Sequence, residues 1–481
     1  MILDPRTCYR ALCARDARFD GRFFVAVSST RIYCRPVCTV KPPRRENCHF
    51  YPSAAAAEAA GYRPCLRCRP ELAPGNASID ATKRLAQAAV SLLEDRALDE
   101  EGLVALAARL GITDRHLRRV FKTEFGVSPV QYAQTQRLLL AKQLLTDTVL
   151  PVTEIAFASG FASVRRFNAL FRERYRLQPS RLRRTRIGAS PDALTFELSF
   201  RPPYDWDLLM SFLDRRAIAG VEAAAKRAYL RTVRIQHGGK EHCGWIEVAP
   251  SPKKPVLRVA VSASLARALP PLLARVKALM DLACNPAEVG KALGALAKRH
   301  PGLRVPGAFD GFEVAVRAIL GQQVSVAAAR TLAGRFATAF GEPFETPWPA
   351  LTTLFPAVER IAALAPGQIA GIGLSMGRAQ AIRALARALA SGALTLAPNV
   401  DVEATLTALR SLPGVGEWTA QYVAMRALAW PDAFPHTDLA LRKALKLTDP
   451  KRVLAAADAW RPWRAYATIH LWQMLAEEDT T

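Results

Sequence analysis

Four cysteines of the amino-terminal region stand in two close pairs, Cys34 with Cys38 and Cys65 with Cys68. Each short loop can supply one edge of a tetrahedron of thiolates, which is the ligand geometry that Zn²⁺ takes in proteins. The spacing therefore predicts one zinc site, with buried free thiols as the alternative. Disulfides are disfavoured in a reducing cytosol.

Charge and aromatic side chains are distributed unevenly along the 481 residues. The chain has 66 Lys and Arg against 42 Asp and Glu, a formal net charge of +24. Residues 1–186 carry a net +15 and residues 187–481 a net +9, while all eight Trp lie from Trp206 to Trp472. Such a basic excess indicates a polyanionic partner, either nucleic acid or an anionic membrane surface. The chain therefore has a composite organisation.

The composition excludes collagen, coiled coil and bulk disorder. No apolar run reaches the roughly 18 residues that a membrane span needs, and Met1–Asp20 alternates charges where a signal peptide would be apolar. With nucleic acid as the polyanion, we expect no membrane partner, a cytoplasmic protein associated with the nucleoid, and a monomer.

Turn-forming and helix-favouring stretches divide the sequence further. Residues 71–78 and 186–192 are expected linkers, and near 301–307 a region with strand-like stretches gives way to helical periodicity. The strand-like stretches are 194–200, 229–236, 245–248 and 256–261. The predicted fold class is multidomain and mainly α with α+β parts. The predicted domains are a small zinc-binding α+β domain (1–75), an all-α tandem helix-turn-helix (80–186), an α+β antiparallel-sheet domain (192–302) and an all-α domain (303–477).

An internal duplication marks the second domain. Leu106–Lys122 and Ile155–Arg172 each show an apolar helix, a turn at Gly111 or Gly160, and a basic helix. In a helix-turn-helix the second helix enters the major groove of DNA. A pair of ordinary helical hairpins with solvated faces is the alternative. The candidate DNA-reading residues are Arg115, His116, Arg118, Arg119, Arg165, Arg166 and Asn168.

Residues Phe24–Cys38, Arg45–Tyr51 and Ala60–Cys68 resemble the zinc domain of the bacterial Ada adaptive-response family. This resemblance implies that Cys34 irreversibly accepts a methyl group from a DNA phosphotriester while zinc keeps it a thiolate. Methylation would change the charge of the zinc–thiolate site from −2 to −1, which strengthens DNA binding. The cations expected on phosphates are Arg35, Lys41 and Arg67.

The tandem at 80–186 resembles AraC-type DNA-binding domains, which also follow the zinc domain in the Ada family. Regulators of this type recruit RNA polymerase, so the resemblance implies promoter DNA and RNA polymerase as partners. The alkylguanine transferase domain of Ada has a Pro-Cys-His-Arg active site, and this chain has no such tetrapeptide.

The second half resembles inducible 3-methyladenine DNA glycosylase II of the helix-hairpin-helix superfamily. The segments that carry the resemblance are Leu198–Leu213, Ile319–Val326, Leu412–Ala420, Phe434–Asp438, Trp460–Tyr466 and His470–Trp472. It implies that Asp438, about 20 residues past the hairpin, is the catalytic carboxylate, against a role as a helix N-cap alone. It also implies an aromatic base pocket of Tyr204, Trp206, Trp418, Tyr422 and Trp472.

The hairpin itself allows two further inferences. Backbone N–H groups of Gly414, Val415 and Gly416 can face a DNA phosphate, and the resemblance implies a monovalent cation at this hairpin. Bifunctional relatives carry a Schiff-base Lys where this chain has Trp418, so the resemblance implies a glycosylase that leaves the abasic site uncut. Gln322 and Gln323 are expected to contact DNA, with Gln323 at the position of an apolar wedge in the family.

The sequence thus predicts a methyl-phosphotriester sensor and AraC-type activator fused to a 3-methyladenine glycosylase. One alternative is a regulator whose glycosylase half is inactive and adds only DNA affinity. The other is a glycosylase for a neutral damaged base, which the cation-binding character of the aromatic rings disfavours.

Overall fold

The structure, a computed structural model, describes residues 4–74, 85–86, 89–90, 93, 100–148, 150–182, 192–225, 227–398 and 400–478. Both expected linkers, 71–78 and 186–192, lie partly outside the described residues. The chain divides into two compact units. The first comprises Met1–Pro202, Ile235–His242 and Ser251–Ala274, and the second comprises Pro203–Arg234, Cys243–Pro250 and Arg275–Thr481. The boundaries of the four predicted domains stay a prediction.

The first unit begins with helix α1 (Pro5–Cys13) and a small four-stranded sheet. The strand order is β3-β1-β2-β4, with β1 (Phe24–Val27) antiparallel to both β2 (Ile32–Cys34) and β3 (Cys48–Tyr51). Strand β4 (Arg63–Pro64) runs parallel to β2, so that Tyr33 lies opposite Pro64. This register places the next residues of the two strands, Cys34 and Cys65, side by side.

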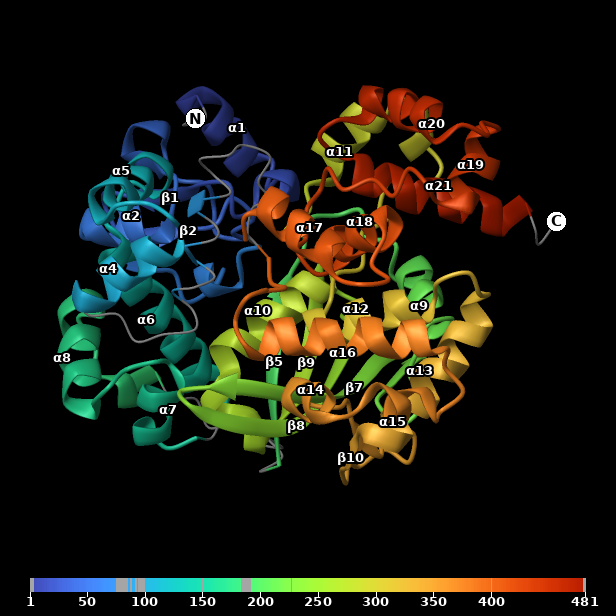
Figure 1. The fold of residues 1–481 in the computed structure, drawn as a ribbon. Helices are drawn as coiled ribbons and strands as arrows, with labels where there is room; N and C mark the ends of the chain where they lie inside the picture. Colours follow the sequence, from blue (N-terminus) through green and yellow to red (C-terminus); the bar gives the residue numbers. More distant parts are fainter. Residues whose placement is uncertain are drawn as a thin grey trace. The chain divides into compact units, whose positions relative to one another are not determined.

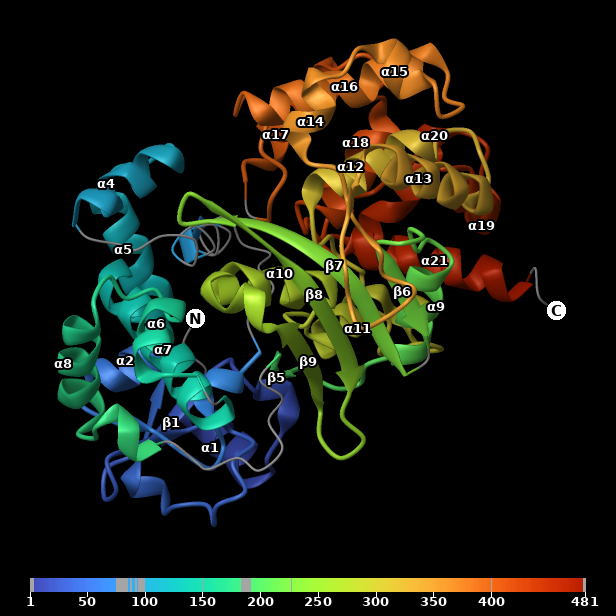
Figure 2. The same ribbon diagram turned by 90° about the horizontal axis from the view of Figure 1, so that it is seen from below.

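Helix α2 (Ala54–Ala59) packs between this sheet and helix α6 (Pro129–Asp147). Its N-cap Ser53 accepts the N–H of Ala56, and five of its six residues are buried. The core on the sheet side includes Leu139 of α6. Alanine is small enough to bring the helix close to both neighbours, as Figure 1 and Figure 2 show for α2 and α6.

The helices that follow form the predicted duplication. Helices α4 (Glu100–Arg109) and α5 (Asp114–Phe125) make one helix-turn-helix, and α7 (Val152–Ala158) and α8 (Val164–Tyr175) make the other. The turns contain Gly111 and Gly160, whose φ angles of +67° and +81° favour glycine. Thr113 and Ser163 cap the basic helices α5 and α8.

A five-stranded sheet has the strand order β5-β9-β8-β7-β6. Its strands are β5 (Ala193–Ser199), β6 (Glu222–Ala225), β7 (Ala228–His237), β8 (Lys240–Pro250) and β9 (Val256–Ser262). In the first unit β5 pairs antiparallel with β9, from Ala193 opposite Ser262 to Ser199 opposite Val256. In the second unit β6 pairs antiparallel with β7. The four predicted strands are confirmed, and the short β6 was not predicted.

The rest of the second unit is mainly helical, in agreement with the predicted fold class. Helices α14, α15 and α16 pack together, α12 contacts α16 and α18, and α19 packs on α21 (Figure 2). Within the described residues, no helix is both long and apolar enough to cross a membrane. The helices are α9 (Trp206–Asp214), α10 (Leu269–Leu279, shared with the first unit), α11 (Pro286–Leu293), α12 (Gly311–Leu320), α13 (Val326–Phe340), α14 (Val358–Ala363), α15 (Pro366–Ala370), α16 (Met376–Ala390), α17 (Val402–Ser411), α18 (Glu417–Arg426), α19 (Leu439–Leu445), α20 (Pro450–Ala456) and α21 (Arg464–Glu478), with a two-stranded pair of β10 (Glu342–Pro343) and β11 (Thr353–Leu354).

Candidate functional sites

The structure brings the four predicted zinc ligands together. The Sγ atoms of Cys34, Cys38, Cys65 and Cys68 all lie within 4.8 Å of one another. A tetrahedral zinc ion at about 2.3 Å from each sulfur needs sulfur atoms about 3.8 Å apart, so this cluster fits the metal. The parallel pairing of β2 and β4 positions it, because the N–H of Cys65 donates to the carbonyl of Tyr33 at 3.0 Å.

The four sulfur atoms differ in their surroundings. Cys38 and Cys65 are buried, whereas Cys34 and Cys68 are half-buried. The backbone N–H of Arg35 donates to Cys68 Sγ at 3.3 Å and that of Arg67 donates to Cys65 Sγ at 3.4 Å. Among the described residues, no backbone N–H donates to Cys34 Sγ. A thiolate with fewer hydrogen bonds keeps more of its charge on sulfur, and of the two half-buried cysteines Cys68 is the one that accepts a described backbone N–H.

The three cations expected on phosphates occupy different environments. Lys41 and Arg67 are exposed. Arg35 is 6% exposed and forms an ion pair with Asp20, while its side chain also donates to Ser199 Oγ at 3.0 Å and to the carbonyl of Cys68 at 3.2 Å. The guanidinium of Arg35 is therefore used within the protein in this structure, and its contact with a phosphate stays a prediction.

Basic side chains line the exposed face of both second helices. Leu117 and Phe121 of α5, and Phe167 and Phe171 of α8, are buried on the opposite face. Arg119 contacts His116 Nδ1 at 3.0 Å. The exposed candidates are Arg115, Arg118, Arg119, Arg165 and Arg166, and the half-buried ones are His116 and Asn168.

The carboxylate of Asp438 lies between two indole rings. Trp418 Nε1 donates to Oδ2 at 2.7 Å and Trp472 Nε1 donates to Oδ1 at 3.1 Å. Oδ1 also accepts the N–H of Leu441 at 3.0 Å, so Asp438 is the N-cap of α19 as well. The two roles are compatible, because the cap uses one oxygen and fixes the orientation of the other.

Tyr422 completes this aromatic group. Its ring stacks on Trp418 with centroids 5.2 Å apart and an interplanar angle of 16°, and it lies 6.3 Å from Trp472. All three rings and Asp438 are half-buried, which leaves them accessible to a ligand. Burial alone would raise the pKa of Tyr422, but the positive charges of Arg426, Arg216 and Arg317 outweigh it and lower that pKa.

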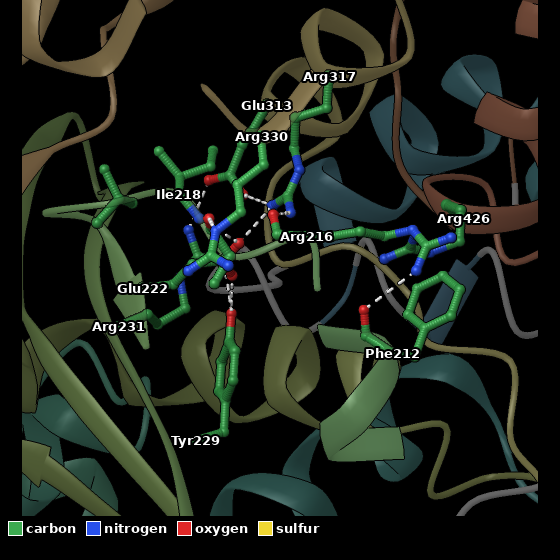
Figure 3. A network of polar contacts seen from close by, with 12 residues as sticks. Phe212, Arg216, Ile218, Glu222, Tyr229, Arg231, Glu313, Arg317, Arg330 and Arg426 are labelled. Atoms are coloured by element: carbon green, nitrogen blue, oxygen red, sulfur yellow. Dashed lines mark hydrogen bonds and ion pairs between the residues drawn. The ribbon is translucent and has the colours of Figure 1, made fainter. Parts of the chain in front are cut away.

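Two predicted pocket residues have other surroundings. The Tyr204 hydroxyl donates to the carbonyl of Met280 at 2.7 Å, its ring lies 4.8 Å from the guanidinium of Arg304, and burial raises its pKa. Trp206 begins α9 and is buried. Phe212, six residues further along α9, was not among the predicted residues, and its ring lies 5.0 Å from the guanidinium of Arg426, which bonds the Tyr422 hydroxyl (Figure 3). Its place in an apolar helix gave no signal that distinguishes it from core.

Gln322 connects two parts of the site. Its side-chain amide donates to the carbonyl of Gly414 at 2.8 Å and to Thr419 Oγ1 at 2.9 Å, and its backbone carbonyl accepts from the guanidinium of Arg378. Gln322 thereby holds the hairpin, and its contact with DNA stays a prediction. Gln323 is exposed and adopts a left-handed conformation with φ +55°.

The hairpin glycines lie before helix α18. Gly414 has φ +74°, and a Cβ atom there would meet Ala381 at 3.2 Å. Gly416 is the N-cap, no side chain caps the helix, and a Cβ atom at Gly416 would meet open space. Val415 is buried and its N–H donates to the carbonyl of Leu412 at 3.2 Å, so this N–H is already used within the hairpin, and the predicted phosphate contacts of the hairpin stay a prediction.

Four family models match the chain in succession. They are the metal binding domain of Ada at residues 7–71, a helix-turn-helix domain at 106–185, the AlkA N-terminal domain at 195–310 and the HhH-GPD superfamily base excision DNA repair protein at 316–453. The order agrees with the predicted fusion.

Individual relatives match the whole chain or one half of it. DNA-3-methyladenine glycosylase 2 of Escherichia coli is 37% identical over 277 residues, 58% of this chain and 96% of its own length. The bifunctional transcriptional activator/DNA repair enzyme Ada of Escherichia coli is 38% identical over 153 residues, 32% of this chain and 42% of its own. The "probable bifunctional transcriptional activator/DNA repair enzyme AlkA" of Mycobacterium tuberculosis is 39% identical over 488 aligned residues, covering 98% of this chain and 97% of its own length. This chain therefore belongs to the family of bifunctional transcriptional activator/DNA repair AlkA proteins.

Proposed function

We propose that the protein excises 3-methyladenine and related alkylated bases from DNA and leaves the abasic site uncut. The observation that carries this proposal is the carboxylate of Asp438, fixed by two indole N–H groups beside the stacked rings of Trp418 and Tyr422. Stacked rings accept an extruded planar base, and the carboxylate stabilises positive charge on the sugar as the base departs.

The chemistry balances without an acid. An alkylated purine is already cationic, so the electrons of the breaking N-glycosidic bond neutralise the departing base. Water then bonds to the sugar carbon and releases a proton, which Asp438 or solvent accepts. Trp418 cannot form an imine, and its N–H is bonded to Asp438.

The hairpin supplies the DNA contact in this proposal. The uncapped start of α18 at Gly416 leaves backbone N–H groups for a phosphate. Hairpin carbonyls are the groups that would bind the expected monovalent cation, and one of them, on Gly414, already accepts Gln322.

Excision is tested with the full chain and methylated duplex DNA. The wild-type protein should release 3-methyladenine, and Asp438→Asn, which keeps the helix cap, should abolish release. Asp401→Asn is the matched control, because Asp401 also caps a helix through its side chain but lies at α17. Release that persists in Asp438→Asn, or its absence in the wild type, would contradict the proposal.

We propose, second, that Cys34 accepts a methyl group from a DNA methyl phosphotriester. Cys34 is half-buried in a cluster that fits zinc, and its sulfur accepts no backbone N–H among the described residues. When bound, zinc keeps the four cysteines as thiolates. A bond forms between Cys34 Sγ and the methyl carbon while the methyl–oxygen bond breaks, and the phosphodiester leaves as an anion.

The remaining partners belong to this second proposal. Exposed Lys41 and Arg67 beside the cysteines, and the basic faces of α5 and α8, support binding to operator DNA. The resemblance to AraC-type regulators adds recruitment of RNA polymerase to the proposal, and we propose that the protein acts as a cytoplasmic, nucleoid-associated monomer. Mass spectrometry of the Cys34 peptide after exposure to methylated DNA should show an added methyl group. An unmodified Cys34 with methyl on Cys68 would overturn the assignment.

A further inference from the structure

A second side chain of helix α18 holds the loop that leads to Asp438. Gln421 lies one turn after Trp418, and its Oε1 accepts the backbone N–H of Phe434 at 3.1 Å. Trp418 itself donates to Asp438 Oδ2 at 2.7 Å. The segment from Phe434 to Asp438 is therefore attached to α18 at both of its ends, once through its backbone and once through the carboxylate.

The loop is short and tightly bonded between these two attachments. The N–H of His436 donates to the carbonyl of Phe434 at 2.8 Å, and that of Asp438 donates to the carbonyl of Pro435 at 2.8 Å. Phe434 is 2% exposed and packs in an apolar core with Leu441 of α19. Moving the backbone of Phe434 would therefore move the carboxylate of Asp438.

Glu417 fixes which end of the Gln421 amide faces the loop. The amide Nε2 donates to Glu417 Oε1 at 2.9 Å. Burial alone would raise the pKa of Glu417, but hydrogen bonds from Arg410 and Gln421 outweigh it and lower that pKa. An ionised carboxylate only accepts hydrogen bonds, so it takes the NH₂ group and leaves the amide oxygen for the N–H of Phe434. Without Glu417 the amide could turn over and lose this bond.

The contacts continue across the hairpin to helix α17. Glu417 Oε2 accepts from Arg410 Nη1 at 2.9 Å, and α17 packs against α18 (Figure 1). Arg410 and Glu417 thus lie on the two sides of the turn that contains Gly414 and Gly416. Their side chains are 40% and 29% exposed, so the ion pair contributes little stability by itself. It occupies one oxygen of Glu417, which leaves the other oxygen for Gln421.

We propose that Gln421 is a positioning residue for base excision, which holds the backbone of Phe434 and so places the carboxylate of Asp438. Arg410 and Glu417 orient its amide from the two sides of the hairpin turn. The turn that is expected to bind a DNA phosphate is thereby connected to the loop that carries the catalytic group. This inference rests on the proposed excision activity and adds to it a residue that acts through Asp438.

Gln421→Met tests the inference in the full chain, because it replaces the amide with a thioether, which is a weak acceptor. Single-turnover release of 3-methyladenine from methylated duplex DNA should slow about 5- to 10-fold, since a buried N–H loses its acceptor. The affinity for DNA should change less than about 2-fold. Hydrogen–deuterium exchange of the peptide that contains Phe434 should become faster.

A matched control separates this contact from the loss of any glutamine. Gln473 of α21 donates to Glu477 Oε1 at 2.9 Å, in the same manner as Gln421 donates to Glu417. Gln473→Met should therefore change neither the excision rate nor the exchange at Phe434.

A reversal of the pair keeps the test decisive should Gln421→Met fail to fold. Gln421→Glu alone places two carboxylates side by side and should slow excision at least as much. Adding Glu417→Gln restores one amide and one carboxylate with the same total charge, and a carboxylate oxygen can then accept the N–H of Phe434. The combined variant should return to within about 3-fold of the wild-type rate.

A wild-type rate in Gln421→Met, a loss confined to DNA affinity, or a combined variant as slow as Gln421→Glu alone would overturn the inference. So would an equal loss in Gln473→Met. A wild type that releases no 3-methyladenine would contradict the excision activity itself. In that case faster exchange at Phe434 in Gln421→Met would still support the hold of Gln421 on the loop, and unchanged exchange would overturn it.

Discussion

The hydrogen bond from Trp418 to Asp438 offers the sharpest test of how the excision site is organised. Trp418→Phe removes the indole N–H but keeps an aromatic ring to stack on Tyr422. Among the described residues, Trp418 is the one donor to Oδ2, at 2.7 Å. Oδ1 has two donors, Trp472 at 3.1 Å and the backbone of Leu441 at 3.0 Å.

This asymmetry sets the expected magnitudes. A hydrogen bond to a charged group contributes about 1.5–3 kcal/mol, and about 1.4 kcal/mol changes a rate tenfold. Trp418→Phe leaves Oδ2 without its donor and should slow excision about 10- to 100-fold. Trp472→Phe leaves Oδ1 bonded to Leu441 and should slow excision only about 3- to 10-fold.

Single-turnover release of 3-methyladenine measures the effect directly, with enzyme in excess so that product release does not contribute. DNA affinity should stay within about 2-fold, because the substituted groups face the carboxylate and the aromatic group is retained. Trp348→Phe is the control, since the Trp348 ring packs against Trp245.

Either of two outcomes would contradict the proposed positioning of Asp438 by the two indole N–H groups. One is a Trp472→Phe variant slower than Trp418→Phe, which would mean that the number of donors on each oxygen does not matter. The other is two variants with wild-type rates, which would mean that Asp438 needs no positioning by the indoles.

Three further predictions concern the first unit. Burial raises the pKa of Glu58 to about 7. The stability that protonated Glu58 contributes is therefore full below about pH 4.5, and about 3 kcal/mol of it is lost as the pH rises through about 7. Glu58→Gln should flatten the dependence of the melting temperature on pH, and an unchanged slope would contradict this prediction. Lys142→Met breaks a buried 2.6 Å pair with Glu71 but leaves Glu71 its 3.1 Å pair with Arg69. Unfolding by urea should therefore show a loss of about 3 kcal/mol, the lower end for a broken buried pair, and part of it should be restored when Glu71→Gln is added. Chelation of zinc should lower the melting temperature of the wild type but not that of Cys38→Ser. A metal assay should show less zinc in Cys38→Ser than in the wild type, and equal zinc contents would contradict the assigned ligands.

Short-range patterns predicted the zinc ligands and the helix-turn-helix repeats well, because their geometry depends on local spacing. Two cysteine pairs suffice for a tetrahedral cluster, and Gly111 and Gly160 suffice for the turns. The position of Asp438 followed from the resemblance alone, since nothing local distinguishes it from any other N-cap.

Contacts between distant segments of the chain could not be predicted from local sequence patterns. Arg35 looked like a surface cation, but Asp20 and Ser199 bury it. Phe212 looked like core, and its neighbours Arg216 and Arg426 come from different helical segments. A single sequence carries no signal for such pairings, since each depends on how remote elements pack.

The alanine helix α2 has a consequence for the ancestry of the fusion. Glu58 accepts hydrogen bonds from Tyr33 on the zinc side and from Thr135 and Tyr175 on the side of the helix-turn-helix repeats, all within 3.3 Å. A recombination point between residues 60 and 100 would take the two sides of this shared interior from different genes. Any exchange of sensor cassettes among related genes therefore has to carry α2 and α6 together, and the two should be inherited as a single block.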